Sequence, residues 1–250
     1  MLVIILLLLG GLTATAWSSP HSVEPEELLG LDSVAVAELV DASKADSCCE
    51  ACLRLAKVSE SVTVSLTRAA DIAAEATSKQ IRSDSFYLSY PPFTRMVSWG
   101  LDLDWSHLGQ HYSCSGRYYR SAETGCREGT TRLYASYKAA VFAWPSCEGD
   151  TSCLLRRIAY LDSLLTSGPS PSASYEISEM KGFVASELAS SLRTAGDQAG
   201  AKRYLILAHE IAGRLMARSD GTTQQAKTSR CSELYFRVTR ELERLGAEDE

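Results

Sequence analysis

Asparagine is absent from the 250 residues of the chain, and histidine occurs only four times. The absence of asparagine excludes N-linked glycosylation, which requires an Asn-x-Ser/Thr sequon. The scarcity of histidine leaves a hydrolase triad few candidates for its general base, and the sequence contains no Gly-x-Ser-x-Gly nucleophile elbow. We therefore name no catalytic residue, no metal ion and no cofactor.

Basic residues are outnumbered by acidic ones: 25 Lys and Arg stand against 31 Asp and Glu, and the formal net charge is −6. Nucleic acids require a basic surface to neutralise their phosphates, and no cluster of Lys and Arg in the sequence is dense enough to supply one. Nucleic acid is therefore excluded as a partner. Hydrophobic residues make up 45% of the chain, which is enough to bury the core of one large domain or two small ones.

The first 16 residues carry no charged side chain, and residues 2–9 form an unbroken run of Leu, Val and Ile. The run is too short for a membrane span, which takes about 20 residues, and Ala14-Thr15-Ala16 provides the small residues that a signal peptidase accepts. We predict a signal peptide over 1–16 and a flexible leader over 17–31. The protein is then secreted or periplasmic and meets a membrane only transiently, through the signal segment. A retained membrane anchor is the alternative, because no Lys or Arg precedes the apolar run.

Eight cysteines follow this segment, and an even number is typical of a disulfide framework in an exported protein. They are Cys48, Cys49, Cys52, Cys114, Cys126, Cys147, Cys153 and Cys231. The spacing allows local loops between Cys114 and Cys126 and between Cys147 and Cys153. The first three are crowded at a predicted helix start, so at least one of them is expected to reach a distant partner such as Cys231. Spacing alone leaves the connectivity open.

Apolar residues recur at helical spacing through most of the chain. Helices are predicted over 33–44, 46–81, 117–143, 151–166, 174–194, 197–217 and 222–245, and no segment after the leader is predicted as a strand. An aromatic segment with a proline pair, Pro91-Pro92, forms a crossover between the second and third of these helices. The expected organisation is a disulfide-linked helical region over 32–167, a linker over 168–173 and a second helical region over 174–250.

One part of the second region carries a recognisable pattern of small and large apolar residues around a turn. The pattern consists of Leu188-Ala189, Leu192, Gly196-Asp197, Ala201, Leu205 and Ala208. Residues 182–215 resemble a single tetratricopeptide repeat, a 34-residue motif of two antiparallel helices. They depart from it at Ala189, Leu192 and Ala212, where Gly, Tyr and Pro are usual. The resemblance implies an all-α fold, an irregular helical-repeat (tetratricopeptide-like) array, which disulfides would cross-link here.

The resemblance also implies a concave groove, faced by the first helix of the repeat, that holds an extended peptide or a partner helix. The residues that it assigns to this groove are Phe183, Ser186, Glu187, Ser190, Arg193 and Thr194. The competing interpretation is that these side chains only solvate an exposed helix face. Trp99 and Trp105 of the aromatic crossover are further candidates for binding a peptide, although they can equally fill the space between helices.

His107 and His111 suggest an alternative function. On a helix, their i, i+4 spacing would place two imidazoles on one face, as in some zinc sites, but the intervening residues lack the Glu of a His-Glu-x-x-His protease. An exported hydrolase or metal-dependent enzyme that uses these two histidines is therefore the alternative. The sequence favours an exported helical protein-binding or scaffold module whose partner is a protein or peptide.

Overall fold

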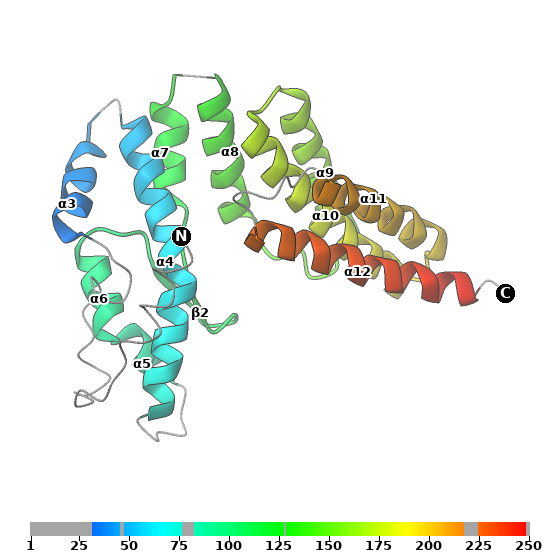
Figure 1. The fold of residues 1–250 in the computed structure, drawn as a ribbon, viewed down its shortest axis with the longest axis horizontal. Coiled ribbons are helices and arrows are strands. Elements are labelled where there is room, and N and C mark those ends of the chain that lie inside the picture. Colours follow the sequence, from blue (N-terminus) through cyan, green and yellow to red (C-terminus); the bar gives the residue numbers. More distant parts are fainter. Residues whose placement is uncertain (1–31, 46–47, 77–82, 128, 218–224, 249–250) are drawn as a thin grey trace, which may run out of the picture. The chain divides into compact units, whose positions relative to one another are not determined.

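The computed structural model describes residues 32–45, 48–76, 83–127, 129–217 and 225–248. This part of the chain contains ten helices and one two-stranded hairpin (Figure 1), so the prediction of a mainly helical fold is confirmed. It divides into two compact units, of which one ends at Cys126 and the other begins at Arg127. The predicted signal peptide and leader lie outside the described residues.

The N-terminal unit is organised around one long helix, α4. Its elements are α3 (Ser33–Ala42), α4 (Cys49–Ala76), α5 (Asp84–Leu88), α6 (Pro91–Ser98), β1 (Asp104–Ser106), β2 (His111–Ser113) and α7 (Arg117–Gly125). Asp32 caps the start of α3, because its carboxylate accepts a hydrogen bond from the Val34 N–H at 2.9 Å. Val62 and Leu66 lie on the buried face of α4, while Val64 is 73% exposed, as the 3.6-residue period of a helix requires.

Aromatic side chains form much of the core of this unit. Tyr87 and Trp105 stack with their ring centroids 4.0 Å apart, and Phe93 stacks on Tyr112 at 4.7 Å. The Tyr112 hydroxyl donates a hydrogen bond to the Tyr87 carbonyl oxygen at 2.6 Å. The proline pair that interrupts the helical pattern opens α6, because a proline in the first turn of a helix forfeits no hydrogen bond.

The hairpin contradicts the prediction that no strand follows the leader. Strands β1 and β2 are antiparallel, with Trp105 opposite Tyr112. The Tyr112 N–H donates a hydrogen bond to the Thr67 hydroxyl at 2.9 Å, which fastens the hairpin to α4. Strands of three residues are too short to show a period-two pattern in the sequence, and their partners in the fold stabilise them.

The sequence predicts a single helix over 117–143, and this prediction is wrong. Helix α7 ends at Gly125 and α8 begins at Gly129. Between them Cys126 has an extended backbone, with φ −82° and ψ 127°, and it forms a disulfide with Cys49 at the start of α4. The bond joins residues 77 positions apart, so helical periodicity contains no information about it.

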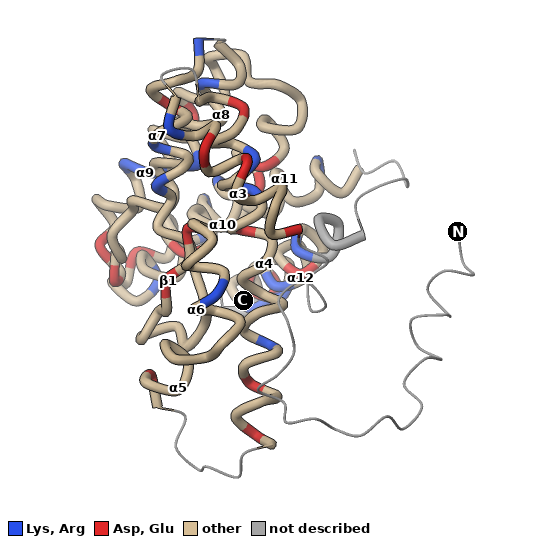
Figure 2. Tube along the Cα trace, turned by 90° about the vertical axis from the view of Figure 1, so that its left-hand side faces the viewer, with Lys and Arg blue, Asp and Glu red and all other residues tan. Residues whose placement is uncertain are grey.

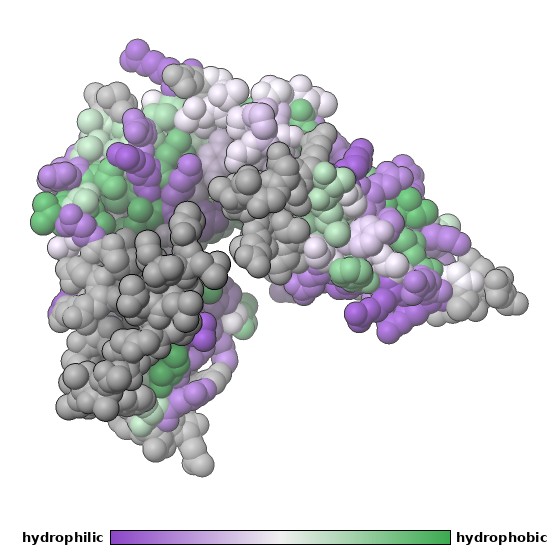
Figure 3. All heavy atoms as spheres, viewed as in Figure 1, coloured by the Kyte–Doolittle hydropathy of each residue, from purple (hydrophilic) through white to green (hydrophobic). Residues whose placement is uncertain are grey.

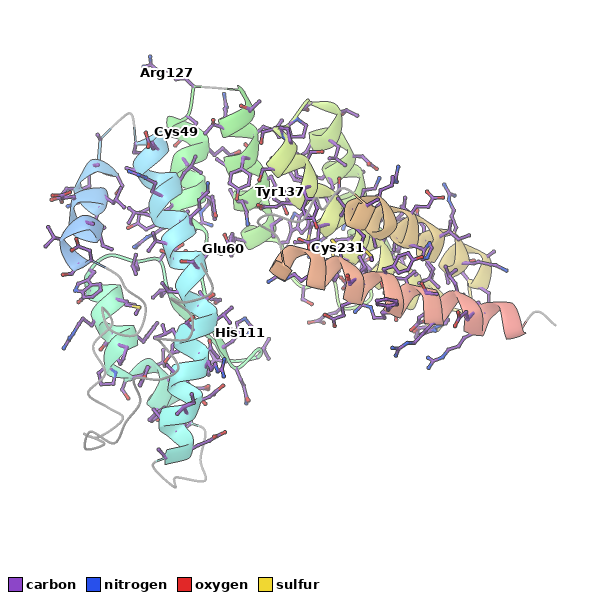
Figure 4. All side chains as sticks on the ribbon, in the orientation of Figure 1. Cys49, Glu60, His111, Arg127, Tyr137 and Cys231 are labelled. Atoms are coloured by element: carbon purple, nitrogen blue, oxygen red, sulfur yellow. A yellow bond between two sulfur atoms is a disulfide. The ribbon has the colours of Figure 1, made fainter. Side chains whose placement is uncertain are left out.

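Two disulfides are present among the described residues (Figure 4). The expected loop between Cys147 and Cys153 is confirmed. The expected loop between Cys114 and Cys126 is wrong, because Cys126 bonds to Cys49, whose Cα lies 4.6 Å away. The cysteines that form no disulfide are Cys48, Cys52, Cys114 and Cys231.

The expectation that every cysteine forms a disulfide is therefore wrong. Three of the four free thiols, those of Cys48, Cys52 and Cys231, are buried. Cys48 Sγ lies 3.8 Å from the Ser121 carbonyl oxygen, and Cys52 Sγ lies 3.8 Å from that of Ser43. Burial, together with the neighbouring Cys48 thiol, raises the pKa of Cys52 to about 12, so this group stays a neutral thiol. Cys231 Sγ lies 3.2 Å from the hydroxyl oxygen of Tyr175, within its own unit.

The described residues of the C-terminal unit form five helices. They are α8 (Gly129–Ala143), α9 (Thr151–Thr166), α10 (Pro171–Thr194), α11 (Gln198–Ala217) and α12 (Gln225–Glu248). One hydrophobic core joins them, and among its fully buried side chains are Leu161 of α9, Leu188 of α10 and Leu234 of α12. Ser170 caps α10 by accepting a hydrogen bond from the Ala173 N–H at 3.3 Å, so this helix begins inside the linker predicted over 168–173. Helices α9 and α10 pack together across the predicted linker. The division between the two compact units lies after Cys126.

Candidate functional site

The residues of the tetratricopeptide-like pattern form a helical hairpin between α10 and α11 (Figure 1). Gly196 follows α10 in the left-handed conformation, with φ 85°, where a side chain would be strained. Asp197 then caps α11, because its carboxylate accepts a hydrogen bond from the Gly200 N–H at 2.8 Å. The two antiparallel helices expected within 182–215 are therefore present.

Helix α12 packs against this hairpin close to Gly182. A Cβ atom at this position would lie 3.0 Å from Leu234 Cδ2 and 3.3 Å from Ile211 Cγ2, closer than ordinary van der Waals contact. Glycine thus allows α10 to approach α11 and α12 together. The result is a layer of three helices in which α11 packs against both of its neighbours.

A groove of about 430 Å³ opens along these three helices. Such a volume lies within the range of ligand-binding clefts. Its walls come from the second half of α10 and the middle of α12, and two buried residues of α11 lie at its floor. The lining residues are Phe183, Ser186, Glu187, Ala189, Ser190, Arg193, Ala201, Leu205, Arg237 and Glu241.

Most of the residues that the repeat resemblance assigns to a groove lie in this one. Five of the six line it: Phe183, Ser186, Glu187, Ser190 and Arg193. Thr194 is exposed at the end of α10 and is not among the lining residues. The α12 wall is not predictable from the sequence, because a single repeat does not specify which later helix packs beside its first helix.

Polar contacts across the groove connect α10 to α12. Arg193 Nη1 lies 2.5 Å from Glu241 Oε2 in an ion pair. Arg237 Nη2 lies 3.4 Å from Ser186 Oγ, and its guanidinium carbon lies 5.9 Å from the ring centroid of Phe183. The α10 residues of the groove therefore also hold the two helices together, and substitutions at Arg193 or Phe183 will affect stability as well as any binding.

A second hollow, of about 440 Å³, continues the groove along α12. Glu233, Phe236, Arg237, Arg240, Glu241 and Arg244 line it, so two of its residues also belong to the first hollow. Phe236 is 57% exposed beside these charged side chains. Figure 3 shows hydrophilic side chains gathered over the C-terminal half of α12.

The arginines of this surface differ in how they are paired. Arg193 is neutralised by Glu241, whereas Arg237, Arg240 and Arg244 have no described carboxylate within ion-pairing distance. Elsewhere in the described part of the chain, basic and acidic residues are interspersed along the helices (Figure 2). The groove thus combines exposed guanidinium groups with an exposed aromatic ring.

The two tryptophans proposed for peptide binding have structural positions in the other unit. Trp105 is 3% exposed, and its indole N–H donates a hydrogen bond to Asp84 Oδ1 at 2.7 Å. A ligand cannot reach a ring that is buried in this way. Trp99 is half-buried at the C-terminal end of α6.

The two candidate histidines lie on the hairpin and not on a helix: His107 follows β1, and His111, labelled in Figure 4, begins β2. His107 Nδ1 lies 2.8 Å from Asp84 Oδ2, while His111 is exposed at the start of β2. The helical geometry that would place both imidazoles on one face is therefore not formed. Among the described residues, no group of three or more His, Cys, Asp or Glu side chains is arranged to hold a metal ion.

Comparison of the chain with protein-family models, with curated proteins and with solved structures finds no match. None of the helices in the described ranges combines the length and the apolar character needed to cross a membrane. The two disulfides are consistent with a protein that folds outside the cytosol.

Proposed function

We propose that this protein is an exported helical module that binds an extended segment of a partner protein in the groove between α10 and α12. The observation that carries the proposal is the groove itself, in which five of the six residues assigned from the repeat resemblance meet a second wall from α12. In this proposal α10 and α11 are the two helices of a tetratricopeptide-like unit, and α12 is the first helix of the next one.

The shape of the surface favours a peptide over a compact small molecule. The two hollows share Arg237 and Glu241, so they form one surface that follows α12 from Glu233 to Arg244. The eleven helical steps from Glu233 to Arg244 rise about 16 Å, which is the length of about five residues of extended peptide. Exposed polar side chains along the surface supply hydrogen-bonding groups for such a backbone.

Export is the second part of the proposal. An uncharged N-terminal segment that ends in Ala14-Thr15-Ala16, followed by a chain with two disulfides, supports a signal peptide and secretion or transfer to a periplasm. A binding module in that setting benefits from covalent links, because partner proteins and chaperones of the cytosol are not there to stabilise it.

A substitution that fills the groove tests the binding function. We use three fluorescein-labelled ten-residue peptides that share a Ser/Gly/Leu frame and carry two Glu, two Gln or two Lys residues. At least one of them is expected to bind the wild-type protein, and Ser190→Trp is expected to weaken that binding by about tenfold or more, because the indole occupies the space between the helices. Fluorescence anisotropy measures the affinity.

Thr194→Trp is the matched control, because it adds the same ring to an exposed position of the same helix outside the groove. This variant is expected to bind like the wild type. The proposal is wrong if none of the three peptides binds at concentrations up to about 1 mM, or if the two tryptophan variants lose affinity equally.

A further inference from the structure

We propose that the ligand of the groove is an acidic segment in which two carboxylate side chains lie three residues apart, with an apolar side chain between them. This inference rests on the proposed function and adds the chemistry of the partner. Three features of the α12 wall carry it: the charge of the surface, the spacing of its arginines and the position of its exposed aromatic ring.

The charge of the surface is opposite to that of the chain as a whole. The two hollows together contain four arginines and three glutamates, whereas the chain has a formal net charge of −6. The ion pair between Arg193 and Glu241 removes one residue of each sign. Three arginines (Arg237, Arg240 and Arg244) and two glutamates (Glu187 and Glu233) then remain, so the surface has a surplus of one positive charge.

The positions of the three arginines raise their mutual repulsion. They stand at i, i+3 and i+7 on α12, and residues three or four apart on a helix are neighbours on its surface. None of them has a carboxylate of the described chain within ion-pairing distance. A bound carboxylate relieves this repulsion, and a guanidinium binds it with two parallel hydrogen bonds, which an ammonium group cannot do.

The spacing of the arginines defines the spacing of the ligand. Arg237 and Arg244 are seven residues apart, which corresponds to a rise of about 10 Å along the helix. In the extended polyproline II conformation, three residues complete one turn and rise about 9 Å, so side chains three positions apart lie on the same side of the peptide. Two acidic residues separated by two others therefore reach both guanidinium groups when the peptide lies along α12.

The aromatic residues account for the apolar side chain of the ligand. Phe236 is 57% exposed, directly precedes Arg237 in the chain and lines the same hollow as Arg240 and Arg244. Phe183 lies under the Arg237 guanidinium on the opposite wall. An apolar residue between the two acidic ones covers Phe236 and removes its surface from water.

Peptide binding tests the inference directly. The probes are the three labelled peptides defined above, with central sequences Glu-Ser-Leu-Glu, Gln-Ser-Leu-Gln and Lys-Ser-Leu-Lys, and a fourth with Glu-Glu-Ser-Leu. The first is expected to bind about tenfold more tightly than any of the other three, since each charge-assisted hydrogen bond that is lost weakens binding. Its affinity is expected to fall as salt is raised from 50 mM to 500 mM.

Charge reversal on α12 locates the effect. The double variant Arg240→Glu/Arg244→Glu is expected to lose about tenfold or more in affinity for the Glu-Ser-Leu-Glu peptide and to keep its affinity for the Gln-Ser-Leu-Gln peptide. The matched control is Arg214→Glu/Arg230→Glu, which makes the same change of net charge at exposed positions outside the groove. It is expected to bind both peptides like the wild type.

The possible outcomes distinguish a failure of this inference from a failure of the proposed function on which it rests. If the neutral or basic peptide binds as tightly as the acidic one, and Ser190→Trp still abolishes that binding, the groove binds peptides and the inference about acidity is wrong. If sedimentation shows a dimer that Phe236→Ser dissociates, the occupant is a second copy of the chain and the inference is also wrong. If no peptide binds, the proposed function fails as well.

Discussion

At the scale of single residues, Asp84 connects the hairpin to the short helix α5. One of its carboxylate oxygens accepts a hydrogen bond from the Trp105 indole N–H at 2.7 Å, and the other lies 2.8 Å from His107 Nδ1. The bond from Trp105, and then the one from His107, lower the pKa of Asp84 below its ordinary value of 3.8. Trp105 and His107, two of the four residues that the sequence nominated for function in this unit, thus serve to position the hairpin.

The lowered pKa makes a prediction for acid solutions. Because the ionised carboxylate is favoured in the folded state, its contribution to stability is present above the ordinary pKa near 3.8 and is lost as pH falls through the lower folded value. Wild-type protein should therefore lose more stability between pH 5 and pH 2 than Asp84→Asn. Urea unfolding followed by tryptophan fluorescence measures the difference, and identical pH dependences would contradict it.

At the scale of elements, the two disulfides differ in the length of chain that they close into a loop. The bond between Cys49 and Cys126 joins the start of α4 to the end of α7 across 77 positions. The bond between Cys147 and Cys153 closes a loop of 6 positions that leads into α9. The longer loop has more conformational entropy to lose in the unfolded chain, so its cross-link stabilises the fold more in the chain-entropy account.

Removing each disulfide tests this difference. Loop entropy alone predicts a loss of about 4.5 kcal/mol for Cys49→Ala/Cys126→Ala and about 2.4 kcal/mol for Cys147→Ala/Cys153→Ala. We expect the first double variant to show the larger fall in unfolding temperature of its own unit in scanning calorimetry. Equal losses, or a larger loss for the shorter loop, would show that native contacts outweigh loop entropy at these sites.

At the scale of the whole molecule, the polypeptide backbone is the covalent link between the two compact units. Neither of the disulfides found in the described residues crosses the boundary at residue 126. The hydrophobic core that joins α8 to α12 runs from Tyr137 to Leu245 and lies wholly in the second unit. The candidate groove lies there too, since α10, α11 and α12 supply its lining.

We therefore expect a fragment of residues 127–250 to fold without the rest of the chain and to retain the peptide binding of the full protein. Its helical circular dichroism should disappear in one cooperative transition with urea, because one continuous core connects its helices. An unfolded fragment, or a folded one that has lost peptide affinity while the full chain retains it, would contradict this expectation.

Only part of the candidate groove could be predicted from the sequence. Helix α9 was predictable to the residue, because Asp150 caps it and apolar residues follow at helical spacing. The α10 wall was predictable for a similar local reason, since Gly196 and Asp197 mark a turn between two helices. Arg237 and Glu241 were not, because the helical period of α12 indicates a buried face without indicating which helix that face meets.

By itself, the sequence determined the helical character of the chain, most helix positions and the turn at residue 196, because capping and periodicity depend on residues a few positions apart. Only the tertiary structure decided that Cys126 bonds to Cys49, that Trp105 is a core residue and that α12 completes the groove. Each of these depends on contacts between residues that are distant in the chain. Such contacts depend on how all the elements pack together, and a local sequence pattern does not specify that packing.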